Sequence, residues 1–182
     1  MRTLTLIILS FFLQSVSAQE YKADVSNSKL SVTGTSTLHD WECVVKSFKG
    51  GINAKIENNR LASIEDFNFQ FKVKSLESGK SSMNKKTYEA LKEEDFPIIS
   101  YQGTAEIISE YSAIFSGKMK MAGTEKEVVT KVKISYEDGK IFLSGEKELK
   151  LTDFNIDPPT AVFGTIKTGD EVAIHYNIQL SK

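Results

Sequence analysis

The chain has 182 residues, with 23 lysines and arginines against 24 aspartates and glutamates, which gives a formal net charge of −1. At about 150 residues per domain, this length predicts one domain. The balanced charge excludes a strongly basic nucleic-acid binder. The single cysteine excludes a disulfide framework within the chain and a cysteine-cluster metal site, and the two histidines argue against a histidine-rich metal site.

The first residues have the pattern of a secretory signal peptide. Arg2 is followed by a nearly continuous apolar run from Leu4 to Leu13 and then by the small residues Val16-Ser17-Ala18. This pattern predicts cleavage after Ala18, a domain over residues 19–182, and a periplasmic or secreted protein. The apolar run is shorter than the roughly 20 residues that cross a membrane, so a retained anchor is the less favoured alternative. We expect no stable membrane insertion after cleavage.

The rest of the chain alternates apolar and polar residues with period two, as half-buried strands do. The clearest runs cover residues 67–73, 111–121, 128–136 and 172–180, and weaker ones cover 29–35, 41–56, 98–108 and 141–151. Their short connections favour antiparallel neighbours, since parallel strands need long crossovers. The sequence therefore predicts an all-β fold of about eight antiparallel strands, either closed as a barrel or stacked as a sandwich.

The segments between these runs predict turns and one short helix. Asp138-Gly139 lies between two alternating runs and predicts a hairpin. Thr168-Gly169-Asp170 is a polar cluster that predicts a further turn. Ser82 is the candidate N-cap of the helix, whose face is marked at i, i+4 and i+8 by Met83, Thr87 and Leu91.

The apolar stripes of the strands leave two interpretations open. A barrel interior is filled either by its own side chains or by a ligand. The stripes here are rich in phenylalanine and methionine, and methionine in particular adapts to a flexible apolar guest. Most apolar stripes are ordinary core, so the pattern alone favours a filled interior.

Residues with catalytic or metal-binding chemistry are few. His39-Asp40 is the obvious polar pair, but neighbours on an extended strand point to opposite faces. His39 and His175 lack the spacing of metal ligands, and His175 is expected to be solvated on a polar strand face. Cys43 has apolar neighbours and is interpreted as a buried side chain rather than a reactive thiol. We expect no catalytic residue, no metal and no enzyme activity, with a metal- or thiol-dependent enzyme using His39, Asp40 or Cys43 as an alternative.

Five segments carry a family resemblance: Ser75–Gly79, Tyr88–Lys92 leading to Phe96–Tyr101, Gly117–Lys126, Leu151–Pro159 and Phe163–Val172. In order and spacing they resemble the YceI-like family of exported lipid- and polyisoprenoid-binding proteins. The resemblance implies a lipocalin-like antiparallel barrel of about eight strands with one short helix. It also implies an apolar tunnel that holds a long isoprenoid or other lipid chain. The family often has histidines where this chain has Ala122 and Asn27-Ser28, so their head-group contacts are not carried over.

This resemblance assigns roles to residues around the expected tunnel. The residues expected on its wall are Phe67, Phe69, Phe71, Phe115, Met119, Met121, Tyr136 and Tyr176. The residues expected to close its mouth are Met83, Tyr88, Leu91, Phe154 and Phe163, and those expected to meet a polar head group are His39 and Trp41.

The expected function is carriage or sequestration of an apolar lipid, with no other cofactor, no nucleic-acid partner and an open oligomeric state. The alternative is a filled barrel that contacts proteins or glycans through loops around Trp41 or Pro158-Pro159.

Overall fold

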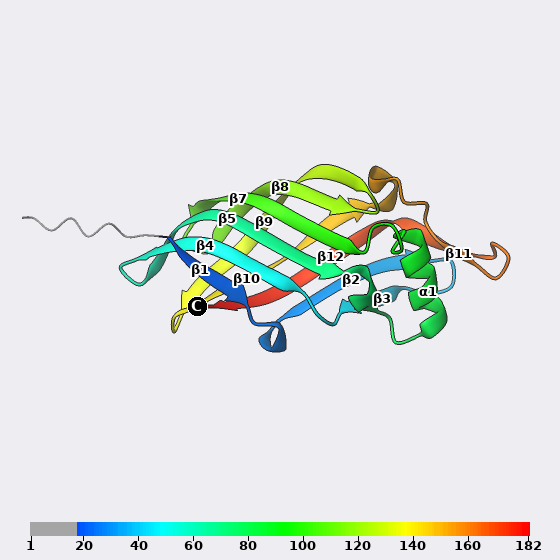
Figure 1. Ribbon diagram of the computed structural model, residues 1–182, viewed down its shortest axis with the longest axis horizontal. Coiled ribbons are helices and arrows are strands. Elements are labelled where there is room, and N and C mark those ends of the chain that lie inside the picture. Colours follow the sequence, from blue (N-terminus) through cyan, green and yellow to red (C-terminus); the bar gives the residue numbers. More distant parts are fainter. Residues whose placement is uncertain (1–17) are drawn as a thin grey trace, which may run out of the picture.

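The structure is a computed structural model that describes residues 18–182, so the expected signal peptide lies outside the described residues except for Ala18. The described part is built from strands with one short α-helix (Figure 1). The strands are β1 (Gln19–Ala23), β2 (Lys29–Ser36), β3 (Trp41–Val45), β4 (Lys49–Glu57), β5 (Arg60–Lys72), β6 (Leu76–Glu77), β7 (Ile98–Ser109), β8 (Ser112–Met121), β9 (Thr124–Glu137), β10 (Lys140–Lys150), β11 (Thr160–Ala161) and β12 (Ile166–Ser181). The helix is α1 (Ser81–Ala90), and 3₁₀ turns cover Val25–Asn27, Val73–Ser75 and Leu151–Phe154.

Eight antiparallel strands close into a barrel in the order β1-β4-β5-β7-β8-β9-β10-β12, with β12 pairing back onto β1. The expected barrel of about eight strands is confirmed, and the sandwich alternative is excluded. The long β12 pairs with β10 along one edge, while its other edge pairs first with β2 and then with β1. β3 and β6 extend this branch at the end of the barrel that carries α1 and β11 (Figure 1).

Three local expectations are wrong. Residues 41–56 form two strands, β3 and β4, because the chain leaves the ladder at Lys46, whose N–H donates to the Ser75 carbonyl. Thr168-Gly169-Asp170 does not form a turn. It lies within β12, where the pairing with β2 shifts register in a bulge, and bulges often contain glycine. Ser82 does not cap α1, because the helix already starts at Ser81. A side-chain hydrogen bond near this end of the helix comes from the Ser78 hydroxyl, which donates to Asn84 Oδ1 at 2.7 Å.

The strand faces agree with the period-two pattern. In β8, Ala113, Phe115, Met119 and Met121 are buried and face the interior, while Lys118 and Lys120 are exposed. The predicted hairpin at Asp138-Gly139 joins β9 to β10, with both residues at positive φ as a type I′ turn requires.

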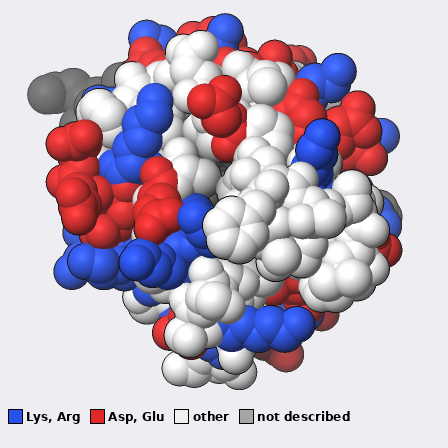
Figure 2. Space-filling model, turned by 90° about the vertical axis from the view of Figure 1, so that its right-hand side faces the viewer, with Lys and Arg blue, Asp and Glu red and all other residues white. Residues whose placement is uncertain are grey.

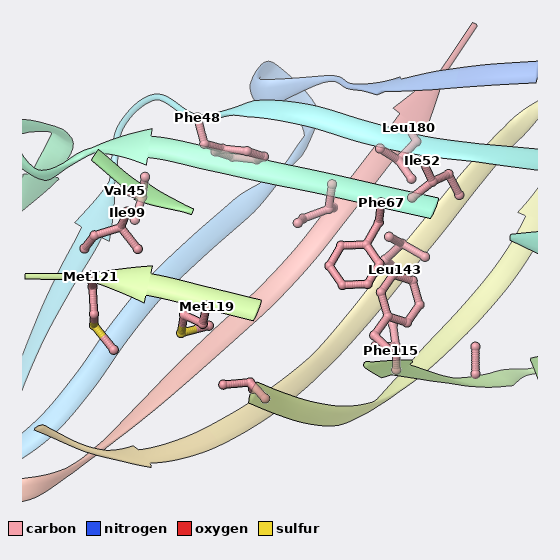
Figure 3. Packing of buried hydrophobic residues seen from close by; sticks show 14 of the residues in the cluster. Val45, Phe48, Ile52, Phe67, Ile99, Phe115, Met119, Met121, Leu143 and Leu180 are labelled. Atoms are coloured by element: carbon pink, nitrogen blue, oxygen red, sulfur yellow. The ribbon is translucent and has the colours of Figure 1, made fainter. Parts of the chain in front are cut away.

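The end of the barrel opposite α1 is closed by packed side chains. The Phe67 ring lies 4.7 Å from Tyr101 and 4.9 Å from Phe115 between ring centroids. Figure 3 shows Phe67 and Phe115 beside Leu143, with Ile52 and Leu180 above them. The side chains that Figure 3 shows in this cluster are nearly inaccessible to solvent: Ile52, Phe67, Phe115, Leu143 and Leu180. This cluster forms the floor of the interior.

Candidate functional site

Above this floor, the barrel holds an internal cavity of about 570 Å³. Known small-molecule sites are mostly apolar pockets of about 300–1,000 Å³, so the volume is sufficient for a ligand. The wall runs along β10 from Leu143 and ends at Leu151, the first residue of the 3₁₀ turn that follows. At about 3.3 Å per residue and a strand tilt of about 40°, that stretch gives a depth of about 20 Å.

The cavity opens at the end that carries α1, the β2–β3 turn and the β11 hairpin. Exposed residues from each of these segments line it, namely Leu38, Lys86 and Val162. Figure 2 views this end and shows uncharged side chains across much of its centre, with charged groups toward the edges. The opposite end is closed by the floor, so the cavity is a pocket with one mouth rather than a through-going tunnel.

Ten of the residues expected around the tunnel line the cavity: His39, Trp41, Phe69, Phe71, Met83, Leu91, Phe115, Met119, Met121 and Tyr176. The sequence analysis missed further wall residues, most of which follow the same period-two signal. These include Leu30, Val32, Cys43, Val45, Phe48, Ile99, Tyr101, Thr130, Lys147, Leu149 and Ile174.

Two expected wall residues, Phe67 and Tyr136, do not line the cavity. Phe67 fills the core of the floor itself, and its ring packs at a tilt against the rings of Tyr101 and Phe115. Tyr136 lies near the closed end and interacts with Tyr21, whose pKa is raised to about 12 by burial and by this contact. Both residues face inward as expected, but their depth along the barrel removes them from the cavity wall.

Three residues expected to close the mouth do not line the cavity. The Tyr88 hydroxyl donates to the Leu76 carbonyl oxygen at 2.9 Å and also lies 3.1 Å from the Lys74 carbonyl oxygen. These contacts hold α1 against the rim of the barrel. Phe154 is 1% exposed and borders a separate outer hollow between β9 and β10. Phe163 is fully exposed, because it and Val162 have positive φ at the tip of the β11 hairpin.

Trp41 occupies a fixed place at the mouth. Its indole N–H donates to the Thr35 carbonyl at 3.0 Å. The ring covers Gly34, where a Cβ atom would lie 2.4 Å from Trp41 Cζ2. Only glycine leaves space for the indole at that position. His39 is exposed beside it, and its Nδ1 donates to the Asp40 carbonyl at 2.7 Å.

The polar side chains deeper in the cavity are hydroxyls. The Tyr101 hydroxyl donates toward the Val128 carbonyl at 2.9 Å. The Tyr176 hydroxyl lies 3.4 Å from Thr130 Oγ1, a long hydrogen bond. Burial raises the pKa of both tyrosines, so both stay neutral at physiological pH. These two hydroxyls therefore add no charge to the wall.

The residues considered for chemistry are dispersed. Cys43 is 1% exposed, as expected, and burial raises the pKa of its thiol, which disfavours the nucleophilic thiolate. His175 is not simply solvated, since Nε2 lies 2.8 Å from Thr33 Oγ1 and Nδ1 3.2 Å from a Glu146 oxygen. Within residues 18–182, no three His, Cys, Asp or Glu side chains gather as a metal site would require. None of the helices in that range has the length and apolarity of a membrane span.

Fold and site together define a closed antiparallel β-barrel with a one-mouthed apolar cavity. The family model described as YceI-like domain matches residues 21–180, and the chain belongs to that family. A comparison with curated proteins finds no match.

Several solved structures share the fold. BcnA from Burkholderia cenocepacia superposes with a TM-score of 0.72 at 16% identity, covering 86% of this chain and 98% of BcnA. A polyisoprenoid-binding domain from Saccharophagus degradans implicated in plant cell wall breakdown gives 0.69 at 10% identity, covering 88% and 97%. The YceI protein of Campylobacter jejuni gives 0.62 at 14% identity, covering 100% and 94%. At these identities the likeness shows the fold.

Proposed function

We propose that this protein is an exported lipid-binding protein that holds one long apolar chain, an isoprenoid or another lipid, for carriage or sequestration. The observation that carries the proposal is the one-mouthed apolar cavity of about 570 Å³. A filled barrel used only for protein or glycan contact has no need for such a space. The similar domain from Saccharophagus degradans is described as polyisoprenoid-binding, which supports the same class of ligand.

A long apolar chain can bind in this cavity without strong polar contacts. Each buried methylene is worth about 0.8 kcal/mol, and the ordering of the ligand offsets part of that gain. A depth of about 20 Å accommodates an extended chain of many methylenes. The signal-peptide pattern of residues 1–18 supports export to the periplasm or out of the cell.

Chain length provides the test. Delipidated protein is titrated with farnesol, geranylgeraniol and longer polyprenols by isothermal titration calorimetry. At about 0.3 kcal/mol per non-hydrogen atom, each added isoprene unit should tighten binding roughly tenfold. The gain should stop once the chain reaches the floor at Phe67. Absence of binding, or an affinity that ignores chain length, would contradict the proposal.

A further inference from the structure

The charged side chains that line the cavity all carry the same sign. They are Lys80, Lys86 and Lys147, in a chain that has 24 acidic residues. Among residues 18–182, no aspartate or glutamate lines the cavity. Lys80 and Lys86 are exposed at the mouth, and Lys86 is paired with Glu89 at 3.3 Å. Lys147 differs from both, because it stands in the wall itself.

Lys147 belongs to the inward-facing set of β10. Ile141, Leu143, Gly145 and Leu149 share its face, and the intervening Glu146 and Glu148 are exposed. Its partner across the ladder is Ile174 of β12. It lies three residues from the end of β10, which at about 3.3 Å per residue and the same tilt of about 40° places it about 8 Å inside the mouth.

The wall is open beside this lysine. The β9–β10 ladder ends at Ser144↔Lys133, so the two strands have separated at the level of Lys147. Lys147 therefore borders both the cavity and the outer hollow of about 350 Å³ between the strands. This opening keeps the side chain partly exposed and allows the ammonium to stay hydrated while no ligand is bound.

The Lys147 ammonium has no partner among the described residues, although carboxylates are near. It forms neither an ion pair nor a hydrogen bond. Glu146 is directed to His175 and Glu171 to Lys150 instead. An incoming anion would therefore meet an ammonium whose charge is not already paired, and the two could form a charge-assisted contact.

A neutral donor lies on the same wall. Gly145, two residues before Lys147, leaves room for the Tyr176 hydroxyl, since a Cβ there would lie 2.5 Å from that oxygen. The hydroxyl is held only by the 3.4 Å contact to Thr130. It is therefore free to turn and donate to an anion beside Lys147.

We infer that the ligand is an amphiphile with an anionic head, a carboxylate or a phosphate, and that Lys147 is its counter-charge. The apolar chain fills the cavity between Phe67 and the mouth, and the head stays beside Lys147, where the wall opens to water. This inference rests on the proposed function and adds the class of head group. Lys80 adds long-range attraction for the same charge at the mouth.

The test compares oleate, oleyl alcohol and oleylamine, which share one apolar chain and differ in head charge. Affinities are measured by calorimetry for the native protein and for Lys147→Met, Lys147→Glu and Lys131→Met. Lys131 is an exposed lysine of β9 that does not line the cavity, so it is the matched control. Circular dichroism and thermal unfolding establish that each variant folds.

The native protein should bind oleate about tenfold tighter than oleyl alcohol, as a charge-assisted contact predicts. Lys147→Met should lose that preference while keeping its affinity for the alcohol, and Lys147→Glu should favour oleylamine. Lys131→Met should keep the native preference. Equal binding of oleate and alcohol by the native protein, or a preference that survives Lys147→Met, would overturn the inference while leaving the proposed function standing. Failure of all three probes to bind would overturn both.

Discussion

Replacing Gly34 by alanine tests how the mouth is built. The added methyl would lie 2.4 Å from Trp41 Cζ2 and 2.8 Å from Cε2, whereas carbon atoms prefer separations of about 3.5–4.0 Å. The indole must therefore move by about 1 Å or more, which breaks its 3.0 Å hydrogen bond to the Thr35 carbonyl.

The magnitude follows from three contributions. Overpacking costs about 1–3 kcal/mol and the lost hydrogen bond about 0.5–1.5 kcal/mol. Replacing a strand glycine by alanine returns about 0.5–1 kcal/mol. The expected net loss for Gly34→Ala is about 1 kcal/mol of unfolding free energy, since Trp41 is only partly buried and the packing cost falls at the low end of its range.

Urea unfolding followed by circular dichroism measures this loss, and Trp41 is the only tryptophan, so its fluorescence reports the movement of the ring directly. The control is the same substitution in a Trp41→Ala background. There the clash is absent, and Gly34→Ala should be neutral or slightly stabilising. A Gly34→Ala protein with native stability and unchanged emission would refute the packing argument. An equal loss in both backgrounds would refute it as well.

Three further predictions concern the cavity, the helix and the contact of β12 with the 3₁₀ turn after β10. Thr130→Phe should fill the middle of the cavity and weaken binding of a long-chain alcohol by at least about tenfold, whereas Val129→Phe on the outer face of the same strand should leave it unchanged in a calorimetric titration. Tyr88→Phe removes the hydroxyl that fastens α1 and should lower the unfolding free energy by about 1 kcal/mol in urea, and an unchanged midpoint would contradict that role. The Asp170 carboxylate accepts hydrogen bonds from the Thr152 N–H at 2.9 Å and from the Thr152 hydroxyl at 2.7 Å, which lowers the pKa of Asp170. The stability that these bonds contribute to the folded state should be complete at neutral pH and should be lost as pH falls below about 4. The difference in melting temperature from Asp170→Asn should shrink over that range, and a difference independent of pH would exclude the assignment.

The fold was predictable because one period-two signal decides both the strands and their faces. The buried sets of β8 and β9 follow the alternation residue by residue. What alternation does not encode is depth along the barrel. Phe67 and Phe69 share a face, yet Phe67 seals the floor and Phe69 lines the cavity. That difference arises from the register of β5 against β7 and β8, a property of non-local pairing.

Lys147 is a cavity residue that the sequence analysis did not predict, for a different reason. In the run Glu146-Lys147-Glu148 the three charges resemble a solvated strand face, although the alternation of Ile141, Leu143 and Leu149 assigns Lys147 to the interior. The apolar signal of a strand says nothing about a charge on its inner face. Phe163 was expected near the mouth but is exposed to solvent. A loop residue is not part of an alternating pattern, so the sequence does not indicate its direction, and the positive φ at the hairpin tip turns this side chain outward.

The most direct test of the central claim is native mass spectrometry of the mature protein isolated gently from its own host, followed by organic extraction. The account predicts one bound species with the mass of a long-chain lipid or isoprenoid, released by solvent and absent from Thr130→Phe. A clean apo mass from the native protein would contradict it and would make the cavity a packing void of the barrel.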